Sequence, residues 1–501
     1  MQDATRATRC LAILQRTTHL DLLLRLWPVL VRIGRLVWHF RRGKLSPEAM
    51  FRFETSLQGH LREMGRLIVE WTVNQLEPSE HEQMPHQFLW EGEYYRKRRQ
   101  KSRLRNLNCL FGPISLERFC FQPLEACGRC LFPLEIQLGI VAQVATPALA
   151  DFVARVSADL TQRQVLQQLL QQNVTWGVST LRKLTTAMAA SMNPHRQAAQ
   201  VQQILGWLST AAAQKAPRAF ALSVGRDGIM IPIVKSNKYK EACAATVSVI
   251  DRFGRRLGTI YLGQMPETGQ TTLSDEMTAL LREVLSQWTG TLPRLIYVTD
   301  CGHHPTEYFE QVLSHMQNPR RSGELLKWEW VVDYYHACQY ITQLAEAIFG
   351  PGRSAFAWAA KQRRVLKENK GGIFRVLRSA GALFSTRGLV GSEDSYWQAY
   401  MYLRQRASKM DYPTYRRFRL PIGSGVTEAA CKIIFTQRFK QSGMKWTGEG
   451  GSVILTLRTI ALSGVWTQVR DATLRSTEMP LPVTPRHPIN ATHEILHKTA
   501  V

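Results

Sequence analysis

The chain has 501 residues, 45% hydrophobic and 21% charged, and its 64 Lys and Arg against 39 Asp and Glu give a formal net charge of +25. This composition is typical of a folded, soluble protein, and the length excludes a single ordinary core, so two to four domains are expected. The excess of positive charge favours a polyanionic partner, namely DNA, RNA or an anionic membrane, although a merely basic protein would show it as well.

Residues 1–90 are predicted to form a helical region, with Pro47 at the start of a helix. The most apolar run in it is interrupted by one aspartate and three arginines, which suits an amphipathic helix with a basic face better than a membrane span. No apolar core precedes a cleavage-like site, so we expect no signal peptide. Nine thinly scattered cysteines indicate free thiols in a reducing cytoplasm.

Residues 91–135 combine a basic run at 94–105 with four cysteines. The run contains Arg98 and Arg99 as candidate DNA contacts. Such a run is either a solvated face or flexible arm, or an arm that contacts the DNA backbone without reading sequence. The CGRC pair is a candidate half of a tetrahedral zinc site, because two thiolates separated by two residues bind one Zn²⁺.

A complete zinc site in this region would use Cys109, Cys120, Cys127 and Cys130. No second pair has the same spacing, so the first two cysteines would have to converge across a turn at Gly112. Buried free thiols are the slightly favoured alternative.

Residues 140–192 are predicted to be a helix-turn-helix region, with a helix at 162–171 and a second helix that opens at Ser179 as its N-cap. A plain helical hairpin fits the spacing equally well. The residues that the second helix would present outward are Thr180, Arg182, Lys183 and Thr186.

The pattern changes over 215–336. The runs FALSVGRDGIMIPIV, AATVSVID and RRLGTIYLG indicate three consecutive strands with tight turns. Two helices and two strands then alternate, at 273–288, 294–300, about 304–317 and 328–336. Three antiparallel strands followed by two strand–helix units predict a mixed sheet flanked by helices in a multidomain α/β protein. The chain continues with a helical basic block at 337–418, a closing helix region at 419–470 and a loosely ordered tail at 471–501.

Acidic residues mark three of these strands. Asp300 ends an apolar strand at the carboxyl edge, where open sheets place their ligands. Asp333 repeats the arrangement, with His336 one helical turn further on. On the first strand Gly225 and Asp227 share a face with other small side chains, which would leave room for a hydrated ligand. Taken singly, each acid is explained at least equally well by a turn or a helix cap.

Together the acids predict a metal site. If the first and fourth strands are neighbours, Asp227 and Asp300 converge, and two close carboxylates repel unless a cation lies between them. Mg²⁺ or Mn²⁺ suits oxygen ligands, and two such ions serve phosphoryl transfer, a chemistry that needs a third acid.

The candidate for the third acid is Glu428 in IGSGVTEAACK. That stretch lacks the spacing of a phosphate loop or a serine elbow. With Gly425 as N-cap, Glu428 would also favour the helix dipole and pair with Lys432.

The segments LIYVTDCGHHPTEYF, WVVDYYHACQYI and PIGSGVTEAACKIIFTQRFKQSGMKW resemble DDE transposases of bacterial insertion sequences, most closely the ISKra-type group of the Mutator-like superfamily. The resemblance covers roughly 140–470. It implies a catalytic domain of RNase H-like fold, with a metal-binding acid triad at Asp227, Asp300 and Glu428. The element formed by Asp333 and His336 would flank the site. The block 337–418 would be an insertion that grips DNA, and the cysteines a degenerate zinc-ribbon-like set.

The function implied is metal-dependent cleavage and strand transfer at the terminal inverted repeats of an insertion sequence. The same site would use water to nick the DNA ends and then the freed 3′-hydroxyl to attack target DNA. A synaptic homodimer or higher oligomer is expected by analogy, in the bacterial cytoplasm at the nucleoid. The alternatives are a helix-turn-helix regulator without catalysis and a nuclease domesticated by its host. The basic residues that either contact phosphates or form a solvated face are Arg438, Lys440 and Lys445.

Overall fold

The computed structural model describes residues 2–77, 84–124, 128–236 and 238–476, the first 18 of them as helical backbone only. The chain divides into two compact units. One contains the residues up to Ser191 together with those from Ala472 on, and the other is Met192–Asp471. Each unit is described by itself.

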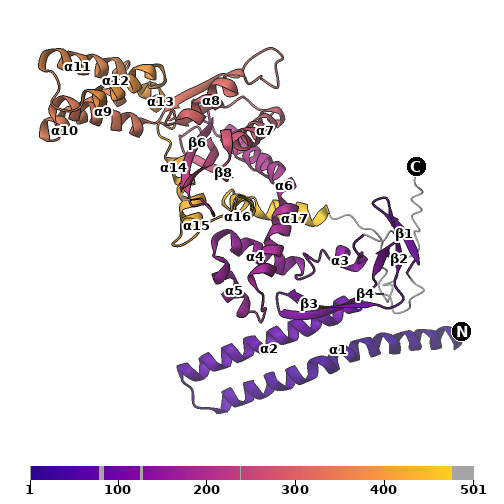
Figure 1. Ribbon diagram of the computed structural model, residues 1–501. Helices are drawn as coiled ribbons and strands as arrows, with labels where there is room; N and C mark the ends of the chain where they lie inside the picture. Colours follow the sequence, from indigo (N-terminus) through magenta and orange to yellow (C-terminus); the bar gives the residue numbers. More distant parts are fainter. Residues whose placement is uncertain (1, 78–83, 125–127, 237, 477–501) are drawn as a thin grey trace. The chain divides into compact units, whose positions relative to one another are not determined.

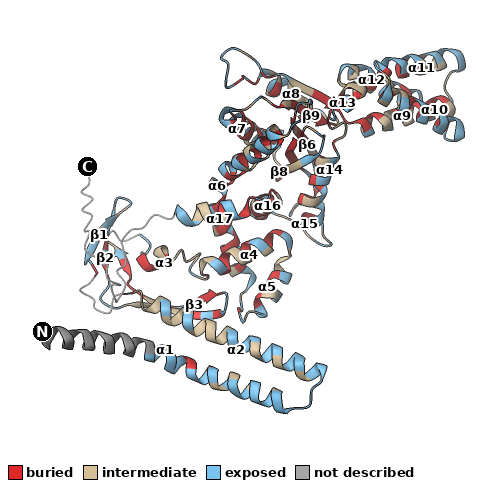
Figure 2. Ribbon diagram, turned by 180° about the vertical axis from the view of Figure 1, so that it is seen from behind, coloured by how far each residue is buried: buried red, intermediate tan, exposed pale blue. Residues whose placement is uncertain are grey.

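The first unit begins with two long helices, α1 (Gln2–Arg42) and α2 (Pro47–Asn74), that lie side by side (Figure 1). Ser46 caps α2, because its Oγ accepts a hydrogen bond from the backbone N–H of Ala49 at 3.1 Å. The predicted helix start at Pro47 is therefore confirmed. Most described residues of both helices are exposed or half-buried (Figure 2).

Short strands follow, and they correct two sequence predictions. The predicted helical region 1–90 ends in a strand, and the basic run 94–105 lies in strands β2 and β3 and their connection instead of forming a flexible arm. The strands form a sheet of order β1-β2-β5 and a separate β3–β4 hairpin that packs on α2. Their bounds are β1 Gln87–Trp90, β2 Glu93–Lys97, β3 Ser102–Cys109, β4 Gly112–Arg118 and β5 Phe121–Pro123.

The short helix α3 (Pro133–Gln137) leads to the predicted helix-turn-helix region, which contains α4 (Pro147–Asp159), α5 (Gln162–Leu170) and α6 (Val178–Ala213). A capping box at Thr161 starts α5, with the predicted bounds to within one residue. The next helix begins one residue before Ser179, so that residue lies inside α6 and is not its N-cap.

The second unit is built on a five-stranded sheet of order β10-β9-β6-β7-β8. β6, β7 and β8 are antiparallel, whereas β9 pairs in parallel with β6 and β10 in parallel with β9. The predicted mixed sheet flanked by helices is therefore confirmed. The bounds are β6 Ala221–Ile231, β7 Lys240–Ile250, β8 Arg256–Gln264, β9 Arg294–Thr299 and β10 Trp328–Val332, with α7 at Thr271–Gln287 and α8 at His303–Gln311.

A helical block leaves the sheet after β10 and returns before the closing helices (Figure 1). It consists of α9 Tyr334–Phe349, α10 Arg353–Glu368, α11 Gly372–Arg387, α12 Glu393–Gln405 and α13 Tyr412–Arg417. The closing elements are α14 Gly425–Cys431, a π-helical turn at Lys432–Thr436, α15 Gln437–Phe439, α16 Gly448–Leu462 and α17 Trp466–Arg475. The predicted helical block at 337–418 is present.

No single helix in the described part of the chain has the length and apolarity to cross a membrane. Among the described helices, one pair, α16 and α17, has the required length and apolarity when the two are taken together, and a bend of 115° separates them.

Candidate active site

The sheet brings Asp227 and Asp300 to one place. β6 and β9 run parallel, with Gly225 opposite Val298, and two more residues along each chain lead to the two aspartates. Asp300 directly follows β9, as predicted. Asp227 lies inside β6, which continues to Ile231, within the run predicted as the first strand. Asp227 and Asp300 line the same pocket, and the negative charge of Asp300 raises the pKa of Asp227.

Helix α14 contributes the third acid by packing on β6 and β7. Thr427 of this helix lies against Gly225, where an added Cβ would be only 2.0 Å from Thr427 Oγ1. The same hydroxyl is hydrogen-bonded to that of Thr246 on β7 at 2.9 Å. The predicted space beside Asp227 is thus partly filled by α14. The next residue of the helix is Glu428, whose side chain is 52% exposed.

The negative charges of the other two acids act on Asp227. Burial raises the pKa of Asp227, and the negative charges of Asp300 and Glu428 raise it further. Hydrogen bonds from the Gly228 N–H and the Cys431 thiol act in the opposite direction. Among the described residues, no Lys or Arg forms an ion pair with any of the three acids. A set of carboxylate oxygen donors without a Lys or Arg ion-pair partner fits a hard divalent cation such as Mg²⁺ or Mn²⁺.

Asp333 holds the α14 end of the site in place. It is completely buried and caps α9, with Oδ1 accepting hydrogen bonds from the N–H groups of Tyr335 and His336. Its Oδ2 accepts hydrogen bonds from the N–H and the hydroxyl of Ser424. Both carboxylate oxygens are therefore engaged, so Asp333 acts as an anchor for the start of α14 and is not available as a metal ligand.

The start of α14 differs in detail from the prediction. Ser424, and not Gly425, is the N-cap residue, so Glu428 lies one position further into the helix. Ser424 Oγ lies 2.9 Å from Glu428 Oε1, and His336 Nε2 lies 3.9 Å from the same oxygen. In the described structure these two residues, and not Lys432, are the side-chain partners of Glu428. The predicted proximity of His336 to the acids is present.

A π-helical turn follows directly after α14, at Lys432–Thr436. Arg458 of α16 stabilises it by donating from Nε to the carbonyl oxygens of Ile433 and Ile434 at 2.9 and 3.0 Å. Such turns interrupt helices at functional sites more often than elsewhere. Here the turn joins α14, which carries Glu428, to a segment that buries Phe435 and Phe439.

An open pocket of about 380 Å³ lies beside the two aspartates. Sequence reasoning missed the basic side of this pocket. Arg226 is buried, and its guanidinium donates to Ser274 Oγ at 2.7 Å and to Gln270 Oε1 at 2.9 Å. Two features of the sequence could have indicated this basic side: Arg226 directly precedes Asp227, and two histidines follow shortly after Asp300. The lining residues are Arg226, Asp227, Gly228, Glu241, Gln270, Asp300, Gly302, His303, His304 and Pro305.

The predicted DNA-contacting residues fall into two groups. The exposed ones are Arg98, Arg99, Arg182, Lys183, Lys440 and Lys445. Arg438, in contrast, is only 2% exposed and its guanidinium lies over the ring of Trp446. This placement leaves Arg438 a role in packing and not as a phosphate contact. In α6, Thr186 is exposed as predicted and Thr180 is half-buried.

The cysteines of the candidate zinc site do not form one described cluster. Cys109 packs among Leu107 and Ile114 in an apolar cluster, and Cys120 lies beside Cys130 next to the bridge between Phe121 and Leu131. Burial and this neighbouring thiol raise the pKa of Cys120 to about 11. Cys127 lies outside the described residues. All seven cysteines with described side chains are free.

The mutual repulsion of the acids leads to a prediction about stability. Because folding raises the pKa of Asp227, the folded chain binds its proton more tightly than the unfolded chain. Stability in EDTA should therefore fall as the pH rises through the folded-state pKa. Asp227→Asn removes this cost and is expected to raise Tm at pH 7.5 by about 2–4 °C, the shift that roughly 1 kcal/mol produces.

The measurement is thermal unfolding in EDTA from pH 4 to pH 8. The gain in Tm should shrink toward pH 4, as the wild-type carboxyl takes up its proton in the folded chain. The exposed Asp275→Asn serves as the control and should leave Tm unchanged at every pH. A gain for Asp227→Asn that does not depend on pH would contradict the electrostatic explanation.

A scan of the sequence against protein-family models finds no match, and a search of curated proteins also finds none.

Proposed function

We propose that the chain is a transposase that cleaves and joins DNA at the ends of an insertion sequence. The observation that carries the proposal is the placement of three acids near one point of the sheet. Asp227 in β6 and Asp300 directly after β9 line the same pocket, and Glu428 on α14 is close enough for its charge to raise the pKa of Asp227. The sheet order supports assignment to the RNase H-like fold, since three antiparallel strands continue into two parallel ones. The resemblance of the three segments around these acids supports the same function.

In this proposal the three acids hold two Mg²⁺ or Mn²⁺ ions, which when bound activate the attacking oxygen and stabilise the leaving oxygen of phosphoryl transfer. The carboxylates hold the ions and do not attack phosphorus, so no covalent protein–DNA intermediate forms. Water is the nucleophile of the first cut, and the freed 3′-hydroxyl is the nucleophile of strand transfer. His336 orients Glu428 or donates a hydrogen bond to the scissile strand.

Rigid positioning is the contribution of the residues around the acids. Asp333 and Ser424 fix the start of α14, so that Glu428 is presented to the sheet edge without reorganisation. Tyr334 donates its N–H to Ile422 O at 2.8 Å and ties the same loop to α9. Catalytic groups that are positioned before the substrate arrives contribute most to the rate.

The direct test uses a supercoiled plasmid that carries the gene with its genomic flanks. We expect Mg²⁺-dependent cuts at a pair of imperfect inverted repeats bracketing the gene, no cuts in EDTA, and a short target duplication outside the repeats. A chain that binds the flanks but never cuts them with Mg²⁺ or Mn²⁺ would favour the regulator without catalysis. A chain that cuts without regard to the repeats would favour the domesticated nuclease.

The second helix of the helix-turn-helix region offers a separate prediction. Arg182 and Lys183 are both exposed on α6. If both contact phosphates, Arg182→Ala/Lys183→Ala is expected to weaken binding to flank DNA and to flatten the slope of log affinity against log salt by about 2.

Fluorescence anisotropy over a range of salt concentrations measures this slope. Arg52→Ala is the matched control, because Arg52 is an exposed arginine in the same unit that pairs with Glu48 on α2. An unchanged slope in the double variant would place the DNA contact elsewhere on the chain.

A further inference from the structure

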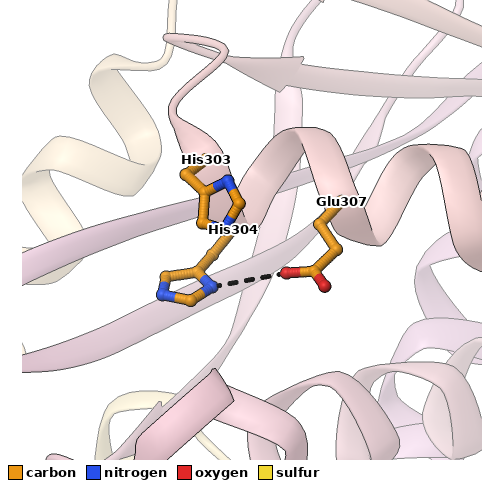
Figure 3. Close-up of side chains that lie close together, drawn as sticks. All are labelled: His303, His304 and Glu307. Carbon is orange, nitrogen blue, oxygen red and sulfur yellow. Dashed lines mark ion pairs between the residues drawn. The ribbon is translucent and has the colours of Figure 1, made fainter.

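A second group of metal-ligand side chains lies next to the acid site. His303, His304 and Glu307 occupy the first turns of α8, and one ligand atom from each lies within 4.8 Å of the others. His304 Nδ1 is 3.6 Å from Glu307 Oε2 (Figure 3). Glu307 lies four residues after His303 and three after His304, so its carboxylate is a neighbour of both imidazoles on the helix surface.

The turn that begins α8 is held from several sides. The N–H of Gly302 donates to Asp300 Oδ1 at 3.0 Å, and Tyr402 OH donates to the Asp300 carbonyl at 2.6 Å. Tyr297 OH donates to the carbonyl of Pro305 at 3.0 Å. These contacts fix the backbone that carries the histidines, so the ligand set is presented by a rigid element.

One nitrogen of the group has no hydrogen-bond partner. His304 Nδ1 is shielded from solvent, although the side chain is 27% exposed, and it accepts or donates no hydrogen bond, since the nearest carboxylate oxygen, Glu307 Oε2, is 3.6 Å away. A buried ring nitrogen without a partner costs free energy, which a ligand bound to that nitrogen would recover. Nδ1 is also the atom that faces Glu307, so the same position that lacks a hydrogen bond lies beside a carboxylate (Figure 3).

We propose that His303, His304 and Glu307 bind a transition-metal ion of the Zn²⁺ class at a site separate from the acid triad. Two imidazoles with one carboxylate are a donor set for zinc, whereas Mg²⁺ prefers oxygen donors alone. Ligand atoms on a tetrahedral Zn²⁺ lie roughly 3.4 Å apart for bonds of about 2.1 Å. Closure of the group therefore needs side-chain movements of only about 1 Å, mostly by the exposed His303.

Three protein ligands leave one coordination position open. Both histidines line the pocket that contains Asp227 and Asp300, so the open position is accessible to water or to an anionic oxygen in that pocket. Binding of the ion itself rests on no part of the proposed function. Its fourth ligand would be a phosphate oxygen of DNA if that function holds.

Co²⁺ is the probe, because its visible absorption reports tetrahedral coordination. Full-length protein, purified without metal and titrated without DNA, is expected to bind one equivalent with visible bands that Zn²⁺ displaces. His303→Ala and Glu307→Gln should each weaken Co²⁺ binding by at least about 10-fold. Asp227→Asn/Glu428→Gln and the exposed His315→Ala should bind like wild type. Circular dichroism verifies that each variant is folded.

Two results would overturn the proposal. One is wild-type protein that binds no Co²⁺ or Zn²⁺ at micromolar concentration. The other is binding that survives in His303→Ala but disappears in Cys120→Ser, which would assign the ion to the cysteines. Because the titration contains no DNA, either result leaves the cleavage test of the proposed function unaffected.

Discussion

Asp227→Asn, Asp300→Asn and Glu428→Gln are each expected to lower Mg²⁺-dependent cleavage of the flank DNA by about 10³-fold or more while DNA affinity stays within about 2-fold. Each amide keeps the shape of the side chain but removes one negative charge from a group of three that act on the same point. Loss of a single preorganised electrostatic contact in an active site costs about 10²–10³ in rate. A lost metal ligand adds to this cost.

The measurement is single-turnover cleavage of an end-labelled duplex that contains one inverted repeat, with binding followed separately by gel shift. Asp275→Asn and Glu449→Gln are the matched controls, because both acids are exposed in the same unit and lie outside the site. Both controls should cut at the wild-type rate. A triad variant that cuts as fast as its control would remove that acid from the catalytic site.

The regulator alternative makes the opposite prediction for the same variants. A protein that only binds DNA would keep every activity after Asp227→Asn and Glu428→Gln. The two functions therefore separate in one experiment, provided that wild-type protein is tested with Mn²⁺ as well as Mg²⁺.

Much of the second unit could be predicted from local patterns. Apolar runs of the length of buried strands identified β9 and β10, and alternation with turn residues identified β6 to β8. The convergence of Asp227 and Asp300 followed from the condition that β6 and β9 are neighbours, which the parallel pairing satisfies. Asp-Gly is also a common turn signal, yet β6 continues through this pair to Ile231, as the apolar residues after it indicated.

The strands of the first unit were missed for a different reason. β2 and β3 contain many charged residues, and such residues have little tendency to form strands on their own. Pairing with β5 and β4 and packing on α2 stabilise them, and these contacts depend on residues distant in sequence. Local propensity therefore indicated a loop or arm where tertiary contacts make a sheet.

The role of Asp333 was also beyond local reasoning. The sequence indicated a helix cap, which is correct for its Oδ1. Its other oxygen is bound by Ser424, which lies 91 positions further along the chain. Only the fold shows that the cap of α9 and the cap of α14 share one carboxylate, and that this shared residue positions Glu428.

Gly225→Ala is expected to lower cleavage by about 10²-fold without loss of DNA binding. The added methyl group would lie 2.0 Å from Thr427 Oγ1 and 3.2 Å from Thr246 Oγ1, so either α14 or β6 must move. Thr427 is next to Glu428, and a misplacement of about 1 Å in an active site costs about 10²-fold. Overpacking of this kind also destabilises the fold, by about 1–3 kcal/mol.

Single-turnover cleavage and thermal unfolding distinguish this effect from simple loss of folded protein. Gly381→Ala is the matched control, because Gly381 lies in α11 with open space around it and should accept the methyl group at no cost. Combining Gly225→Ala with Thr427→Ala removes the nearer clashing oxygen and should restore part of the lost rate. If the double variant cuts no faster than Gly225→Ala, displacement of α14 is not the cause. A Gly225→Ala protein with the wild-type rate would show that Glu428 does not depend on the close contact between α14 and β6.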